Sequence, residues 1–308
     1  MQRTFTISLA AQYTDSLIQQ LQPLEEVIGL ALQRGSSLKP PGDIITLQVL
    51  NTGADEVLRR IDQVCPPNHY AIATSELASL INPAQEKRIR YDVDEAIWEE
   101  METGLRYQGR LTGNFVSLMA LGGAISAVGL VSEPVPQAVA FVAASIIAPG
   151  FEPLAKVPLG LVLKNYQTAL FGLRSSLIGY GIVIAGAAIT FLVLQWMGIT
   201  NASEFIKNPE VEAIINPTGK NITVSLCGTV AGCITVAAYR RSVIAGALIA
   251  MIVITAMAMI GVSLACGRWD YAKHGLERAG IDVGLIILSG VIVFGAKQWL
   301  LRQRKPLV

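Results

Sequence analysis

Glu152 is the residue whose type and setting could most readily do chemistry. It lies in residues 148–158, inside an otherwise apolar part of the chain, among residues that interrupt helices: Pro149, Gly150, Pro153 and Pro158. Proline has no amide donor and crowds the preceding turn, so this run predicts a broken membrane helix. A carboxylate at such a break is typical of a site for a cation or a proton. Alternatively, the run lies at the cytoplasmic interface and Glu152 pairs with Lys156 one turn further on.

The composition predicts that this run lies within a membrane. Of 308 residues, 52% are apolar and 15% are charged, and the mean hydropathy is +0.49, which excludes a wholly soluble chain. Residues 1–110 hold 10 Lys+Arg and 15 Asp+Glu, which leaves 24−10 = 14 and 23−15 = 8 for residues 111–308. The boundary near residue 110 therefore separates a water-facing module from a membrane module.

The first 82 residues alternate between strand and helix patterns. Period-two alternation predicts a strand over 3–10, and short apolar runs predict further strands over 27–32, 44–50 and 70–74, with a turn-rich segment at 35–42. Apolar stripes predict one helix through Leu17, Leu21 and Leu24 and another over 57–64. The order βαββαβ is that of an α+β ferredoxin-like domain. It carries no metal-binding loop and no RNA-binding pattern, which leaves a regulatory or oligomerisation role.

Residues 83–111 form a linker that contains an amphipathic connecting helix at 92–110. Val93, Ile97, Met101 and Leu105 recur every four residues, with acids toward the start and arginines at the end. The helix is either a spacer that packs on the membrane module or a neighbouring subunit, or a signalling helix that transmits movement of the ferredoxin-like domain.

Residues 112–308 predict an α-helical polytopic membrane domain. Six apolar runs are long enough to span, at about 113–131, 134–154, 175–197, 218–238, 242–265 and 281–300. Basic residues follow the second, fourth and sixth runs, which places both termini in the cytoplasm. Lys156, Lys164, Arg174, Arg240, Arg241, Arg302, Arg304 and Lys305 carry this pattern. Arg268, Lys273 and Arg278, beside Asp270 and Glu277, fall in the loop 267–279 on the opposite side, where basic residues do not fit.

An internal repeat accounts for that misfit. Shifting the chain by 103 residues places the segment 161–173 on 264–276, with coincident leucines, an aromatic residue, an alanine and a Gly-Leu pair. With this shift the first three spans fall on the last three. Because each copy contains an odd number of spans, the second copy lies inverted in the membrane. A 3+3 inverted repeat is a transporter architecture, with the pathway between its halves.

The same residues resemble a known family of bacterial hydrophobic membrane proteins, the domain of unknown function 389. Residues 144–149 (Ala-Ser-Ile-Ile-Ala-Pro), Pro153-Leu154 and Asn216-Pro217 match its pattern, and the resemblance covers about 90–300. It implies a six-span inner-membrane protein. The resemblance therefore predicts the architecture of the chain but not its activity. Two positions depart from it. Thr255 and Ala256 stand where the family has a second proline pair, and Glu152 stands where it commonly has glycine.

Two classes of function follow. No nucleophile–base set, metal set, phosphate loop or dinucleotide motif occurs in the sequence, so we expect neither an enzyme nor a cofactor, and no nucleic-acid partner. The first class is a transporter or channel for a small molecule or ion in the bacterial inner membrane, gated by the cytosolic domain, with Pro149, Gly150, Glu152, Pro153, Lys156, Asn216, Pro217 and Thr255 as pathway candidates. The second is a non-transporting sensor or scaffold that oligomerises the ferredoxin-like domain, which the absence of another buried charge favours. In either class the chain is expected to form a homo-oligomer.

Overall fold

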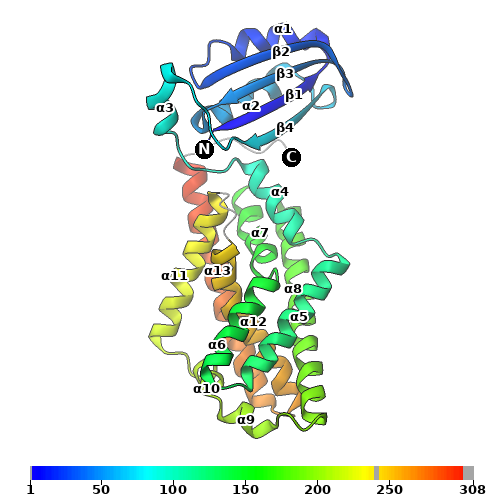
Figure 1. The fold of residues 1–308 in the computed structure, drawn as a ribbon, viewed down its shortest axis with the longest axis vertical. Helices are drawn as coiled ribbons and strands as arrows, with labels where there is room; N and C mark the ends of the chain where they lie inside the picture. The colour runs from blue at the N-terminus through cyan, green and yellow to red at the C-terminus, as the bar shows by residue number, and fades with distance from the viewer. Residues whose placement is uncertain (1, 239–242, 301–308) are drawn as a thin grey trace. The chain divides into compact units, whose positions relative to one another are not determined.

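Two compact units make up the chain, one ending at Glu99 and the other beginning at Glu100. The structure, a computed structural model, describes residues 2–238 and 243–300, and for residues 243–252 it describes the backbone alone. The division between the units falls inside the predicted linker. Figure 1 labels the helices and strands of both.

The first unit is a four-stranded antiparallel sheet with two helices. Its elements are β1 (Arg3–Leu9), α1 (Ala11–Leu21), β2 (Val27–Leu38), β3 (Pro41–Val49), α2 (Ala54–Val64), the 3-10 turn η2 (Pro67–His69) and β4 (Tyr70–Glu76). The strand order is β2-β3-β1-β4. The predicted order βαββαβ is therefore confirmed. The predicted turn at 35–42 is too long, because β2 and β3 pair as far as Leu38 and Pro41.

The core of this unit lies between the sheet and its helices (Figure 1). Phe5, Ile7 and Leu9 alternate along β1 and are fully buried, as the period-two pattern predicts. They pack with buried side chains of α1, β3 and α2: Leu17, Leu21, Ile45, Leu47, Val57 and Ile61. Burying a side chain of this size contributes about 1.5–3 kcal/mol.

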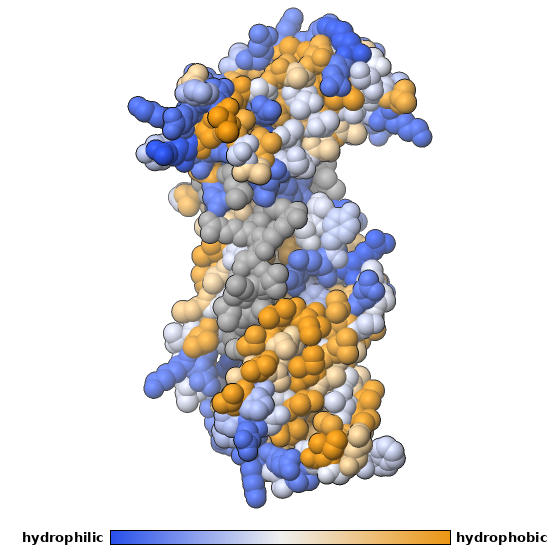
Figure 2. All heavy atoms as spheres, viewed as in Figure 1, coloured by the Kyte–Doolittle hydropathy of each residue, from blue (hydrophilic) through white to orange (hydrophobic). Residues whose placement is uncertain are grey.

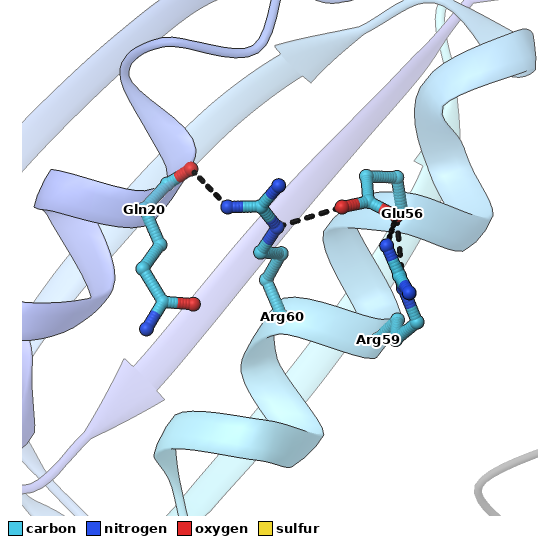
Figure 3. A network of polar contacts seen from close by, with 4 residues as sticks. All are labelled: Gln20, Glu56, Arg59 and Arg60. Carbon is cyan, nitrogen blue, oxygen red and sulfur yellow. Dashed lines mark hydrogen bonds and ion pairs between the residues drawn. The ribbon is translucent and has the colours of Figure 1, made fainter.

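A polar network on the surface joins α1 to α2 (Figure 3). Arg60 donates to the carbonyl oxygen of Gln20 at 3.3 Å and to the carboxylate of Glu56 at 2.7 Å, and Arg59 pairs with the same carboxylate. The hydrogen bond from Arg60, with the charge of Arg59, holds the pKa of Glu56 below its usual value. Because the groups are partly exposed, the network contributes little to stability.

The predicted connecting helix at 92–110 is wrong in its first turn and a half. After η3 (Pro83–Gln85) and α3 (Glu86–Arg90), residues 92–97 have no regular secondary structure, and α4 runs from Trp98 to Gln108. Asn51, in the turn η1 (Asn51–Gly53), donates its side-chain amide to the carbonyls of Val93 and Glu95 at 2.8 and 2.6 Å. A helix would need those carbonyls for its own amides, so these bonds keep the segment from continuing α4 toward the N-terminus.

We expect Asn51→Ala to release this segment. The change removes two hydrogen bonds from a fully buried side chain, at a cost of about 1–3 kcal/mol. Amide hydrogen exchange in a peptide covering 91–98 of the full-length protein should accelerate roughly tenfold to a hundredfold. The matched change at the exposed Asn68 should leave it unaltered. Equal exchange in both variants would mean that Asn51 does not hold the segment.

The second unit is helical. Its elements are α5 (Gly113–Leu130), α6 (Pro134–Ile147), α7 (Phe151–Val162), α8 (Tyr166–Trp196), α9 (Ala202–Lys207), α10 (Pro209–Ile215), α11 (Gly219–Ala237), α12 (Val243–Ala265) and α13 (Trp269–Leu300). Among the described residues, four helices are long and apolar enough to cross a membrane: α5, α8, α11 and α13. The pair α6–α7, bent by 53°, counts as a fifth candidate.

The predicted fifth run, 242–265, and some of the predicted topology signals fall partly beyond the described residues. In α12 the side chains are described from Val253 onward, and that apolar part is shorter than a span. Arg240, Arg241, Arg302, Arg304 and Lys305 lie outside the described residues. The structure therefore supports a helical membrane-like unit with four to five candidate spans.

Two helices begin earlier than predicted. α8 starts at Tyr166 rather than at 175, and α13 at Trp269 rather than at 281. Their 31 and 32 residues make helices of about 46–48 Å, longer than a hydrocarbon core of about 30 Å. Arg174 and Arg278, predicted to lie in loops, are therefore helical.

The surface of this unit is apolar where lipid would contact it. Figure 2 shows apolar residues gathered over the face of the helical unit that carries α5 and α6. Leu121, Val139 and Leu170 are each more than half exposed. By contrast, the described side chains of α12 from Val253 to Ser263 are buried, because this helix packs against α5, α6, α7, α8, α11 and α13. An apolar exterior around such a helix is typical of a membrane domain.

Candidate functional site: a helix break and a polar cavity

The second candidate span is broken at residues 148–150. α6 ends at Ile147 and α7 begins at Phe151, and the amide of Gly150 bonds back to the carbonyl of Ala148 at 2.7 Å. Pro149 and Gly150 lie in the break, as predicted. Pro153 instead occupies the first turn of α7, where an amide has no helical partner to lose, and Pro158 lies inside α7. The break is thus three residues long rather than the eleven of the predicted run.

Tyr180 of α8 satisfies a carbonyl that the break exposes. Its hydroxyl donates to the carbonyl oxygen of Gly150 at 2.8 Å, and both groups are buried. Backbone groups freed at membrane depth need such a partner. The sequence reasoning missed this residue, although a tyrosine in the middle of an apolar span signals a buried hydroxyl that needs a partner.

We expect Tyr180→Phe to destabilise the break. The change leaves the buried Gly150 carbonyl without a donor, at a cost of about 1–3 kcal/mol. The thermal unfolding midpoint in detergent should fall, whereas Tyr166→Phe, the same change on the exposed first residue of α8, should not move it. Identical midpoints would show that the Tyr180 hydroxyl does not stabilise the break.

Glu152 and Lys156 lie on α7 but do not pair. Among the residues that the structure describes, no ion pair joins the partly exposed Glu152 to Lys156, so the predicted pair is wrong. Lys156 is buried and interacts electrostatically with Glu102 and Arg106 of α4. Glu102 accepts hydrogen bonds from Arg106 at 2.9 Å and from Thr168 of α8 at 3.2 Å. The Lys156 side chain therefore joins a polar cluster between α4, α7 and α8.

A polar cavity lies on the other side of α12. Its volume is about 240 Å³, and it is formed between α6, α10, α11, α12 and α13. The lining residues are Phe141, Glu210, Ala213, Ile214, Asn221, Val224, Ser225, Thr255 and Arg278. Polar groups thus reach a partly open space between apolar helices, and a concave space of this mixed lining is a candidate small-molecule site.

A buried ion pair lies at this cavity. The Nε atom of Arg278 is 3.0 Å from Asp282, one turn along α13, and both side chains are less than a tenth exposed. The Nη2 atom of Arg278 donates to the hydroxyl of Ser225 on α11 at 2.7 Å. The Nη1 atom is buried with no hydrogen-bond partner. Charged side chains in this setting generally mark a functional site.

The short helix α10 brings Glu210 to the cavity. Asn208 caps α10 by accepting from the amide of Glu210 at 2.9 Å, and the same oxygen accepts from the side chain of Gln137 on α6 at 2.9 Å. The Asn208 amide group in turn donates to the carbonyl of Ser132. These buried bonds fix the start of α10 against the start of α6, so Glu210 keeps its place in the lining.

The other predicted residues are distributed on either side of α12. Thr255 lines the cavity, and its neighbour Ile254 packs against Gly150 at the break. Asn216 and Pro217 lie in the exposed turn between α10 and α11, where Asn216 donates to Glu212 at 2.6 Å. α12 continues without a break through Thr255 and Ala256, where the family pattern has prolines. The structure thus brings Thr255 to the cavity but not Asn216 or Pro217.

Sequence reasoning missed Arg278 and Asp282. It placed Arg278 in a loop, and it counted no buried charge other than Glu152. That count is wrong, since Arg278, Asp282 and Lys297 are all buried in α13. The signal that could have found the pair is an arginine and an aspartate one turn apart at the edge of an apolar run.

A comparison with known families finds a match within the helical unit. Residues 145–288 match the sequence model of the family described as "Domain of unknown function (DUF389)". The chain carries a DUF389 domain over these residues, which include the break, the cavity and the ion pair. The resemblance seen in the sequence is confirmed there.

A relative extends over most of the chain. An uncharacterized protein of Methanocaldococcus jannaschii is 20% identical over 263 residues, which cover 85% of this chain and 79% of that protein. No solved structure matches the chain. Neither the family's description nor the relative's name assigns an activity.

Proposed function

We propose that this protein transports a small solute or ion through its helical unit. The observation that carries the proposal is the Arg278–Asp282 pair beside a polar cavity between membrane helices. Burying two charges in an apolar bundle is costly, so such pairs are kept chiefly where they serve a pathway. A purely structural bundle would be more stable with apolar side chains at both positions.

We further propose six spans arranged as a 3+3 inverted repeat, with α12 as the fifth span in chain order and α13 as the sixth. A shift of 103 residues places α8 (166–196) on residues 269–299, almost the whole of α13. The turns before them also correspond, with positive φ at Lys164 (56°) and Gly267 (71°). The amides of Asn165 and Arg268 bond to the carbonyls five residues earlier, at 2.8 and 2.9 Å.

Helix packing follows the same shift. A Cβ added at Gly172 would meet the backbone of Pro153 and Val157, and one added at Gly275 would meet Ala256 and Ile260. These positions differ by 103 residues throughout. Thr255 is then the counterpart of Glu152, which supports a pathway that runs past both residues at the interface of the halves.

We propose that both termini are cytoplasmic and that the membrane is a bacterial plasma membrane. The basic residues after the second, fourth and sixth spans support this orientation. The cavity lies toward the ends of the helices that α9 and α10 connect, because it is lined by α10 and by the first two turns of α11. In this orientation the cavity faces the extracytoplasmic side.

The cytosolic ferredoxin-like domain would act through α4. Residues 92–95 are bonded to Asn51 in the first unit, whereas Glu102 is bonded to Thr168 in the second. Gly109 lies against Pro153 and Lys156, directly after the break. A movement of the first unit would thus be transmitted to α7, and a homo-oligomer of that unit would couple several copies.

One observation favours the non-transporting scaffold instead. α12 is unbroken where the family pattern has a second proline pair, so the two halves do not have matching breaks. If alternating access needs both breaks, the helical unit would only anchor the first unit.

Flux into proteoliposomes distinguishes the two functions. Labelled neutral amino acids, acetate, phosphate and rubidium ions are offered in turn to vesicles that contain the full-length protein. Transport predicts saturable uptake of at least one of them, lost in the double variant Arg278→Gln/Asp282→Asn and kept in Lys273→Gln, an exposed change on the same helix. If no solute enters faster than into empty vesicles, the scaffold is the better account.

A further inference from the structure

The hydrogen-bonding groups of Arg278 leave one position open for a ligand. Nε faces Asp282, Nη2 donates to Ser225, and Nη1 is buried without a partner. A guanidinium donates in a planar fork that fits two oxygens of a carboxylate. Because Arg278 lines the cavity, a carboxylate bound there would lie against its guanidinium, and a small rotation of the side chain would bring Nη1 to the acceptor that it lacks.

A simple anion does not fit the rest of the lining. Asp282 already balances the charge of Arg278, and Glu210 adds a second carboxylate to the cavity. An anion would therefore enter a site that is negative overall. A simple cation would suit Glu210, but it would leave the Arg278 donor unpaired and would face its charge.

A zwitterion satisfies both ends. Its carboxylate would accept from Arg278, and its ammonium would lie toward Glu210, with the side chains of Asn221 and Thr255 available for further hydrogen bonds. The apolar walls, Phe141, Ile214 and Val224, would contact a carbon skeleton. The volume of about 240 Å³ is below the roughly 300–1,000 Å³ of pockets for drug-sized ligands, which restricts the solute to a small one.

We propose that the cavity binds a small zwitterionic solute of amino-acid size, with its carboxylate at Arg278 and its ammonium toward Glu210. The inference rests on the proposed function, because it names the class of solute for the same site. Binding and flux are separate measurements, so the two proposals can fail separately.

Matched ligands test this assignment. Calorimetry on the full-length protein in lipid nanodiscs compares L-alanine with propionate and ethylamine, and L-leucine with 4-methylpentanoate and 3-methylbutylamine. In each trio the carboxylate is the amino acid without its amino group, and the amine is the amino acid without its carboxylate group. We expect at least one amino acid to bind at least tenfold more tightly than both of its partners.

Variants test which residue binds each end of the ligand. Glu210→Gln, on an exposed side chain, should weaken the amino acid toward the affinity of its carboxylate partner and leave that partner unchanged. Arg278→Gln/Asp282→Asn should abolish binding of both, while Lys273→Gln should change nothing. Because the Glu210 side chain is exposed, its replacement should not prevent folding. Binding to this variant can therefore be measured even if the double variant does not fold.

Three results would overturn the proposal. They are a carboxylate that binds as tightly as its amino acid, an amine that does so, or no binding by either trio to folded protein. Amino-acid binding without flux would refute the proposed transport but not the proposed binding site. Flux of another solute without amino-acid binding would refute the proposed binding site but not the proposed transport.

Discussion

Replacing Asp282 with asparagine should destabilise this protein by about 3–5 kcal/mol. The substitution removes the counter-ion of Arg278, whose guanidinium then stays charged among apolar helices. Breaking a buried pair by removing one partner costs this much, because the remaining charge is desolvated without compensation. In detergent, the thermal unfolding midpoint should fall by several degrees, and the variant should accumulate poorly.

Two further variants separate the pair from its surroundings. Adding Arg278→Gln to Asp282→Asn should restore much of the lost stability, because no charge is then left buried. The exposed pair of Lys273 and Glu277 on the same helix has the same spacing, with its charged atoms 3.7 Å apart, so Glu277→Gln should cost less than about 1 kcal/mol. A double variant less stable than both single variants would contradict a pairing role.

Gly123→Ala should disrupt the packing of α5 against α8. A Cβ at this position would stand against the carbonyl oxygen of Val183, closer than real Cβ contacts allow. Gly186 on α8 approaches the carbonyl of Ala120 on α5 in the same way, so the two backbones are close at two points. Neither carbonyl can rotate away without breaking its helix, and we expect a loss of about 1–3 kcal/mol.

The matched control is Gly181→Ala. Gly181 is in α8, and no atom lies within 4 Å of a Cβ added there. Alanine favours helices over glycine by about 1 kcal/mol, so this change should be neutral or stabilising. Thermal unfolding of the two variants in one detergent gives the comparison. Equal midpoints would mean that α5 and α8 do not approach each other closely at Gly123.

Elements with a strong repeating pattern could be predicted from the sequence, and their ends could not. The alternation of Phe5, Ile7 and Leu9 predicted β1, and apolar runs predicted the long helices of the second unit but not the short α9 and α10. The non-helical segment 92–97 carries a good helical stripe, but Asn51, more than forty residues earlier, takes up its carbonyls. A tertiary hydrogen bond of this kind leaves no mark in a local pattern.

The candidate site could be predicted only in part. Proline chemistry correctly indicated a break at Pro149 and Gly150, and the family pattern pointed to Thr255. The predicted run, however, began at residue 281, so Arg278 was assigned to a loop outside the helix that buries it, and Asp282 was left at the edge of the run without a partner. Recognising them requires knowing that α11 offers Ser225 at the same level, which is a property of the packed bundle.

The most direct test of the account asks whether water reaches the cavity from the extracytoplasmic side. Cys65, Cys227, Cys233 and Cys266 are replaced by alanine, and a single cysteine is introduced at Asn221, in the cavity lining, or at Tyr166, at the opposite end of the helical unit. Intact cells are then treated with a membrane-impermeant thiol reagent. The account predicts that Asn221→Cys is labelled from outside, and that Tyr166→Cys is labelled only after the membrane is opened. Labelling of Tyr166→Cys in intact cells, with Asn221→Cys protected, would contradict it.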